Sequence, residues 1–158
     1  MKKSTAKIAY MYANGDVDTP YWEKTSPPTA YLFLPRETEE MCVRLEFGLV
    51  GLVDNNYYTI STRIFHGTDE VGYPDDMAVA EKALSFFAIS GEYASHSSTH
   101  ERFIAKSNGY YRIEATLYEC KIEHDEKPID ERDEELIDEN NAVHRNDIFV
   151  AIASEWSE

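Results

Sequence analysis

Apolar and polar residues alternate along two long stretches of the chain, on either side of a segment rich in aspartate and asparagine. Every second residue from Met41 to Leu49 is apolar, and the same period returns from Tyr58 to Ile64. This period is typical of β-strands with one buried face, and Asp54-Asn55-Asn56 between them has the chemistry of a turn. The pattern predicts a long antiparallel hairpin, whose apolar face the rest of the chain must cover.

Further strands are expected on both sides of this hairpin. Their signals are alternation or short apolar runs bounded by proline, glycine or asparagine. The predicted strands are 6–13, 31–34, 83–90, 103–105, 110–123 and 147–154.

Two segments have less regular patterns. Residues 76–89 carry apolar side chains at spacings of three and four but end in an aromatic run, so we expect a short helical turn at 76–82 before the strand at 83–90. The serine-rich segment 92–102 is expected to be a loop. Gly48 and Gly51, inside the first long strand, indicate a bulge or a close approach of another backbone.

These elements predict one domain over residues 1–158, a mainly antiparallel β-sandwich with one or two short helices. Its size is sufficient for a hydrophobic core, and its eleven tyrosines suit half-buried strands. The alternative is an α+β fold, in which residues 76–88 and 130–140 are both helical and pack against one sheet.

The residues Gly109-x-Tyr111-x-Ile113, after Asn108, resemble the entry to the sixth strand of immunoglobulin-like sandwiches. That strand carries a "tyrosine corner", and antibody domains have a cysteine at the position of Ile113. Ser107 stands where an acidic residue is usual. The resemblance covers about seven residues; it implies a sandwich in a broad sense and nothing about function.

Thirty acidic residues against fifteen basic ones give the chain a net charge of −15. Such a surface repels nucleic-acid phosphates and anionic lipids and attracts cationic partners, so we expect neither direct nucleic-acid binding nor membrane binding. No apolar run approaches the roughly 20 residues of a membrane helix, and no signal peptide is recognisable. Cys42 and Cys120 lie in predicted strands, where free thiols behave as small apolar groups. A cytoplasmic location is therefore expected.

The acidic charge is concentrated in residues 123–141, an insertion before the last strand. This segment has ten acidic and two basic residues and so carries −8 of the total charge. It suggests a docking face for a basic protein, as in immunity, anti-defence or nucleic-acid-mimic inhibitors, if Asp130 begins a helix. The residues expected to bind the partner are Asp130, Glu131, Asp133, Glu134, Glu135, Asp138 and Glu139.

A second hypothesis is a structural or accessory module that binds through aromatic side chains. Tyr21 and Trp22 lie in a proline-rich loop, where they either fix the loop to the sheet or form a contact surface.

Residues for catalysis or cofactor binding do not form a recognisable motif. His96 and His100 have zinc-motif spacing, but serines surround them and the expected glutamate is replaced by Ser97. The loop 67–70 and Asp75-Asp76 match no calcium-binding loop. We therefore expect no cofactor and no enzymatic activity. A metal-dependent enzyme, with His66, His96 and His100 brought together only by the fold, is the alternative.

Overall fold

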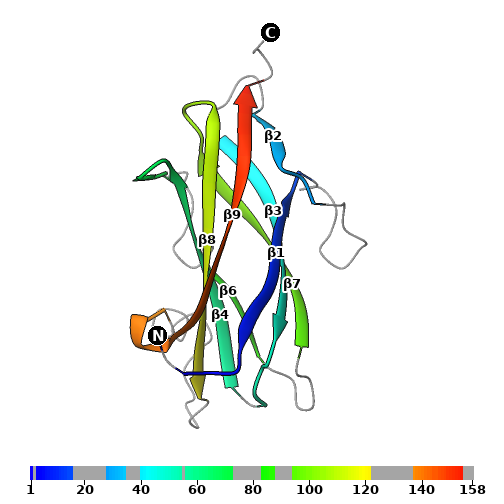
Figure 1. Cartoon of the computed structure of the whole chain (residues 1–158), viewed down its shortest axis with the longest axis vertical. Helices are drawn as coiled ribbons and strands as arrows, with labels where there is room; N and C mark the ends of the chain where they lie inside the picture. Colours follow the sequence, from blue (N-terminus) through cyan, green and yellow to red (C-terminus); the bar gives the residue numbers. More distant parts are fainter. Residues whose placement is uncertain are drawn as a thin grey trace.

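The computed structural model describes residues 1, 3–15, 28–34, 40–54, 56–72, 83–87, 94–121 and 137–154. These residues form nine strands arranged in two facing sheets (Figure 1). The strands are β1 (Lys7–Asn14), β2 (Tyr31–Leu34), β3 (Glu40–Val50), β4 (Asn56–His66), β5 (Asp69–Glu70), β6 (Ala83–Phe87), β7 (Ala94–Ile104), β8 (Gly109–Lys121) and β9 (Ala142–Ser154).

The first sheet has the order β1-β3-β7 and is antiparallel throughout. The second has the order β2-β9-β8-β4-β5, and β6 pairs with β4. Its pairs are antiparallel except β2 with β9, which run parallel. The predicted β-sandwich is therefore confirmed, with one parallel pair that the sequence did not indicate.

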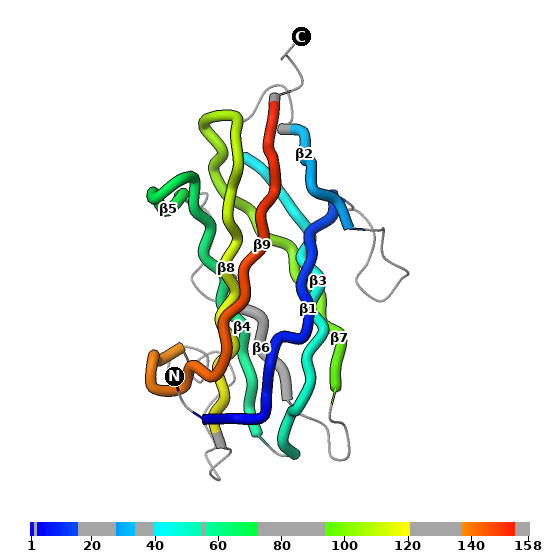
Figure 2. The backbone as a smooth tube through the Cα atoms, viewed as in Figure 1, coloured from blue at the N-terminus to red at the C-terminus, as the bar shows by residue number. Residues whose placement is uncertain are grey.

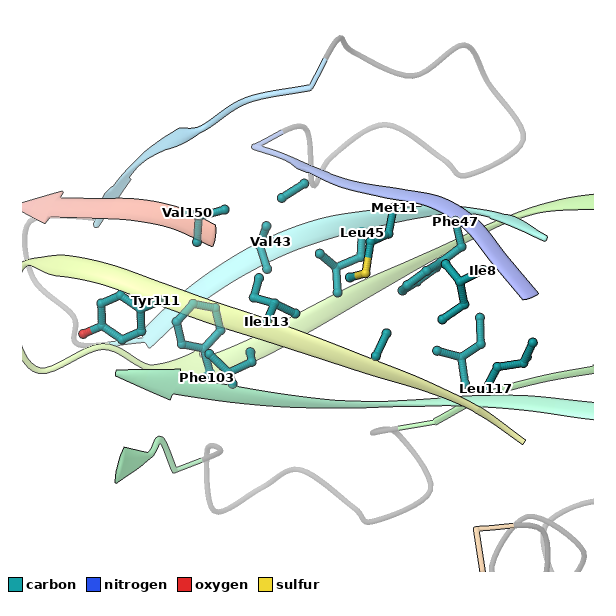
Figure 3. Close-up of a cluster of buried hydrophobic side chains, with 14 of the residues drawn as sticks. Ile8, Met11, Val43, Leu45, Phe47, Phe103, Tyr111, Ile113, Leu117 and Val150 are labelled. Atoms are coloured by element: carbon teal, nitrogen blue, oxygen red, sulfur yellow. The ribbon is translucent and has the colours of Figure 1, made fainter. Parts of the chain in front are cut away.

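The hydrophobic core lies between the two sheets (Figure 3). Alternate residues of β3 point into it, which is why the period of two was so clear between Met41 and Leu49. Phe103 from the first sheet meets Tyr111 from the second, with ring centroids 6.0 Å apart. Each large side chain buried in this way contributes roughly 1.5–3 kcal/mol. The tube in Figure 2 shows β1 beside β9 at one side of the sandwich.

The predicted hairpin between the two long strands is wrong, although both strands exist. β3 lies in the first sheet, whereas β4 lies in the second and pairs with β8 over eleven positions. Gly51, with φ of 70°, follows β3 at the start of the crossing from one sheet to the other. Alternation reveals that a strand has one buried face, but a connection of this length can lead to either sheet.

The predicted loop at 92–102 is also wrong, since β7 runs from Ala94 to Ile104. It pairs with β3 along its whole length, from Glu40 opposite Ile104 to Val50 opposite Ala94. Threonine favours strands, but serine and histidine have no strong intrinsic preference for them, and the long partner strand β3 imposes the extended conformation.

The helical predictions are resolved only in part. The α+β alternative is wrong for 83–87, which form β6, and the predicted turn at 76–82 lies outside the described residues, as do residues 130–136. At the end of the acidic segment, Glu139–Asn141 form a 3-10 helix. No helix among the described residues is long and apolar enough to cross a membrane.

The close backbone approach predicted at the two glycines is confirmed at Gly51, whereas the close neighbour of Gly48 is a side chain. A Cβ atom at Gly48 would lie 2.0 Å from the Tyr10 ring, and the pairing of β1 with β3 shifts register between Ile8 and Tyr10. A Cβ atom at Gly51 would lie 2.0 Å from the Thr5 carbonyl oxygen. Only glycine leaves room for these neighbours.

Candidate functional site

Four aromatic side chains project into solvent from the outer face of β2, β9 and β8. We call them the aromatic face. The exposed fractions are 50% for Tyr31, 58% for Phe33, 76% for Tyr110 and 64% for Phe149. Such large exposed apolar side chains, gathered on one face, typically mark an interaction surface.

The strand register explains why these residues lie together. Ala151 of β9 is opposite Tyr31 on one side and Tyr110 on the other, so the small alanine lies between two tyrosines. Phe149, two residues earlier on the same strand, points to the same face. Phe33 contacts Tyr31 edge to face, with centroids 5.0 Å apart. Three strands distant in sequence thus build one surface.

The rest of this outer face is charged, and its arginines are paired with carboxylates. Arg63 donates to Glu70, and Arg112 donates to Glu114, each at 2.8 Å. Arg112 also lies over the Phe65 ring, 4.4 Å from its centroid. These two ion pairs are partly exposed and stabilise the sheet only slightly. Their carboxylates nevertheless neutralise the positive charge beside the aromatic face.

A partly buried polar network occupies the outer face of the other sheet. Arg44 and Glu46 are fully buried and form an ion pair, with 2.6 Å between Nε and Oε1. Nε2 of His96 lies 2.7 Å from the second carboxylate oxygen of Glu46, and Nδ1 lies 2.9 Å from the Tyr10 hydroxyl. Ser98 donates to Glu46 as well. The carboxylate is thus surrounded by donors, which indicates a structural network in which each group positions the next.

The two histidines whose spacing is that of a zinc motif, His96 and His100, do not lie close together. His96 and His100 lie on one strand rather than on a helix, and four residues along a strand span about 13 Å. They therefore do not share a metal ion. Among the described residues, no three histidine, cysteine or acidic side chains are grouped so that they could hold one. Cys42 and Cys120 lie in β3 and β8 as partly buried thiols.

The third histidine lines a cavity of about 310 Å³ at the end of the sandwich. His66 stacks on Tyr111, with ring centroids 4.6 Å apart, and its Nδ1 lies 3.2 Å from the Ser107 hydroxyl. In a Ser-His-Asp triad, Nε2 accepts the serine proton while Nδ1 faces the acid. Here the serine is at Nδ1, so the arrangement differs from a triad. The Glu70 carboxylate beside the cavity is engaged by Arg63.

The acidic residues predicted to bind a partner are only partly described. Asp130, Glu131, Asp133, Glu134 and Glu135 lie outside the described residues, and so do Tyr21, Trp22 and Asp75-Asp76. The other two carboxylates have local roles. Asp138 accepts a hydrogen bond from the Asn140 amide and so caps the 3-10 helix, and Glu139 accepts two hydrogen bonds from Nη2 of Arg145.

Sequence reasoning missed the aromatic face. The spacing of Tyr31 and Phe33 shows that they share a face, and the same holds for Phe149 and Ala151. However, nothing in the sequence indicates that β2 pairs in parallel with β9, and this pairing brings Tyr31 to Ala151.

No protein-family model matches this sequence, and no curated protein matches it either. Among solved structures, the chain is similar to the ASH/PapD-like domain 7 of human CEP192, with 13% sequence identity and a TM-score of 0.30. The match covers 90% of this chain and 97% of that domain. The assignment to the β-sandwich class rests on the strand pairing itself.

Proposed function

We propose that this protein is a non-enzymatic binding module that captures a basic protein partner, with the aromatic face as its contact surface. The observation that carries the proposal is the cluster formed by Tyr31, Phe33, Tyr110 and Phe149 on one sheet face. Aromatic side chains dominate the binding energy of protein interfaces, because they bury a large area at a small entropic cost.

The net charge of −15 supports a basic partner. Opposite charge accelerates encounter and makes association depend on salt, because the Debye length falls from about 10 Å at 0.1 M to 3 Å at 1 M ionic strength. The aromatic contacts then slow dissociation once the partner is seated. Fast association driven by charge and slow dissociation caused by aromatic contacts suit an inhibitor that blocks this partner.

A second candidate contact is the acidic segment 123–141, with its charge of −8. The local roles of Asp138 and Glu139 speak against these two carboxylates as free contacts, since each would have to leave its intramolecular partner. The aromatic face needs no such rearrangement, and we therefore place the contact there and give the acidic segment a steering role.

The test is capture from a host lysate, identification of the captured protein and measurement of its affinity in purified form. Phe33→Ser with Phe149→Ser should weaken binding of that basic protein at least tenfold. Tyr10→Ser is the matched control, because Tyr10 is an exposed aromatic on the other sheet. Equal affinities for the wild type and the double variant would refute the aromatic contact.

The steering role has its own test. Replacement of the seven carboxylates from Asp130 to Glu139 by amides should slow association and reduce its dependence on salt, while dissociation of the complex changes little. If this variant instead loses all binding and the aromatic variant loses none, the acidic segment is the contact.

A further inference from the structure

Two tyrosines flank one alanine on the aromatic face, an arrangement that we call the slot. Tyr31 and Tyr110 stand on the two strands that flank β9, and both are opposite Ala151. Neighbouring strands are 4.7–4.9 Å apart, so the two tyrosine backbones are about 9–10 Å apart. A side chain that enters between the two tyrosines would therefore meet the Ala151 methyl group at the sheet and a phenol on either side.

We propose that this slot binds an arginine side chain of the partner, an inference that rests on the proposed function. A cation is attracted to an aromatic ring within about 6 Å of the ring centroid. With the two rings extended outward at the spacing of their backbones, a guanidinium group halfway between them would lie about 5 Å from each. Because it is planar and weakly hydrated, guanidinium stacks between rings more readily than the ammonium group of lysine.

The charges around the slot favour a cation. The described arginines on this outer face, Arg63, Arg112 and Arg145, each pair with a carboxylate. Asp147 adds a further negative charge, and its Oδ2 lies 3.6 Å from Nη1 of Arg112. An incoming guanidinium group therefore meets the already neutralised charge of Arg112, two residues from Tyr110, and the field of a strongly acidic protein.

One of the two rings, that of Tyr31, is already in contact with a neighbour before binding. Phe33 contacts Tyr31 edge to face, which limits the rotation of this ring. A ring that is already ordered loses less side-chain entropy when a ligand enters.

The probe is a short peptide whose only charged group is one arginine side chain, and its binding is followed by NMR titration of the whole protein. We expect saturable shifts of the Ala151 methyl and of the Tyr31 and Tyr110 ring resonances, since a stacked guanidinium lies against all three. The same peptide with citrulline, which has the same shape but no charge, should bind about tenfold more weakly. Equal binding of both peptides would overturn the cationic slot.

Two variants locate the site. Tyr110→Leu keeps an apolar side chain but removes one ring, and should weaken arginine binding about tenfold. Ala151→Leu places a larger side chain between the two tyrosines and should also block the peptide. Tyr10→Leu, on the other sheet, should leave binding unchanged, and thermal melts identify any variant that fails to fold. Arginine binding unaffected by either slot variant would refute the assignment.

The outcomes separate this inference from the proposed function. In one outcome, Phe33→Ser with Phe149→Ser abolishes capture of the basic protein, Ala151→Leu leaves capture unchanged, and the arginine and citrulline peptides bind equally well. The aromatic face then binds the partner, but the slot does not recognise arginine.

Discussion

The Tyr58 hydroxyl donates a hydrogen bond of 2.5 Å to the buried carboxylate of Glu119. The same oxygen of Glu119 accepts from the Ser4 hydroxyl at 3.0 Å, and Tyr58 in turn accepts from the Val53 amide at 2.8 Å. Burial, followed by the hydrogen bond to Glu119, raises the pKa of Tyr58 above its ordinary value. The tyrosine thus joins the chain entering β1, the crossing after β3 and the strand β8.

Tyr58→Phe should therefore lower the free energy of unfolding by about 1–3 kcal/mol, because it removes a donor from a buried carboxylate. Urea denaturation measures the loss. In a double-mutant cycle with Glu119→Gln, the two substitutions should be clearly non-additive. Additive losses would show that the pair contributes no coupling to stability.

The crossing from β3 to β4 should depend on Gly51. In Gly51→Ala the alanine would have to adopt a left-handed backbone conformation, and its Cβ would lie 2.0 Å from the Thr5 carbonyl oxygen. Gly67 is the matched control, since its φ is 64° but nothing lies within 4 Å of a Cβ there. Gly67→Ala should cost about 1–2 kcal/mol, and Gly51→Ala clearly more. Equal midpoints in urea would contradict the close approach.

The tyrosine corner suggested by the sequence is present in the structure. The Tyr111 hydroxyl donates to the Ser107 carbonyl at 2.6 Å, four residues upstream. Tyr111→Phe should cost about 0.5–1.5 kcal/mol in thermal or urea unfolding. Tyr110→Phe, one residue away and exposed, should cost almost nothing. If both variants have the same stability, the corner hydrogen bond makes no net contribution.

The features that the sequence predicted are local. Alternation located the strands around Val43, Ile60 and Ile113, because a strand with one buried face must repeat every two residues. Gly48 and Gly51, which lack a side chain, indicated a close approach of another part of the chain. Strand partners could not be predicted, since the sheet to which β3 and β4 belong depends on contacts between distant residues.

The candidate site was less predictable than the fold. The aromatic face depends on β2 pairing in parallel with β9, and the Arg44–Glu46 pair lies on a sheet face that alternation assigns to solvent. Charge density pointed instead to residues 123–141, because composition is visible without a structure and surface geometry is not.

The last prediction concerns Glu101, a carboxyl group buried between the two sheets. Burial raises its pKa to about 7, and the Thr62 hydroxyl offsets part of the shift. No described residue gives its Oε2 atom a hydrogen bond. The native state therefore holds the proton more tightly than the unfolded state, whose carboxyl titrates near 4.5.

The sign of the pH dependence follows directly. The contribution of Glu101 to stability is fully present below pH 4.5, falls as the pH rises from 4.5 through about 7, and is lost above that. The loss amounts to about 3 kcal/mol. Glu101→Gln stays neutral and should remove this dependence of stability on pH. The free energy of unfolding of the variant should therefore rise relative to that of the wild type as the pH increases. Urea denaturation from pH 5 to 8 measures the difference, in which titration of other groups such as His144 cancels. Parallel stability curves would show that Glu101 has an ordinary pKa in the folded protein.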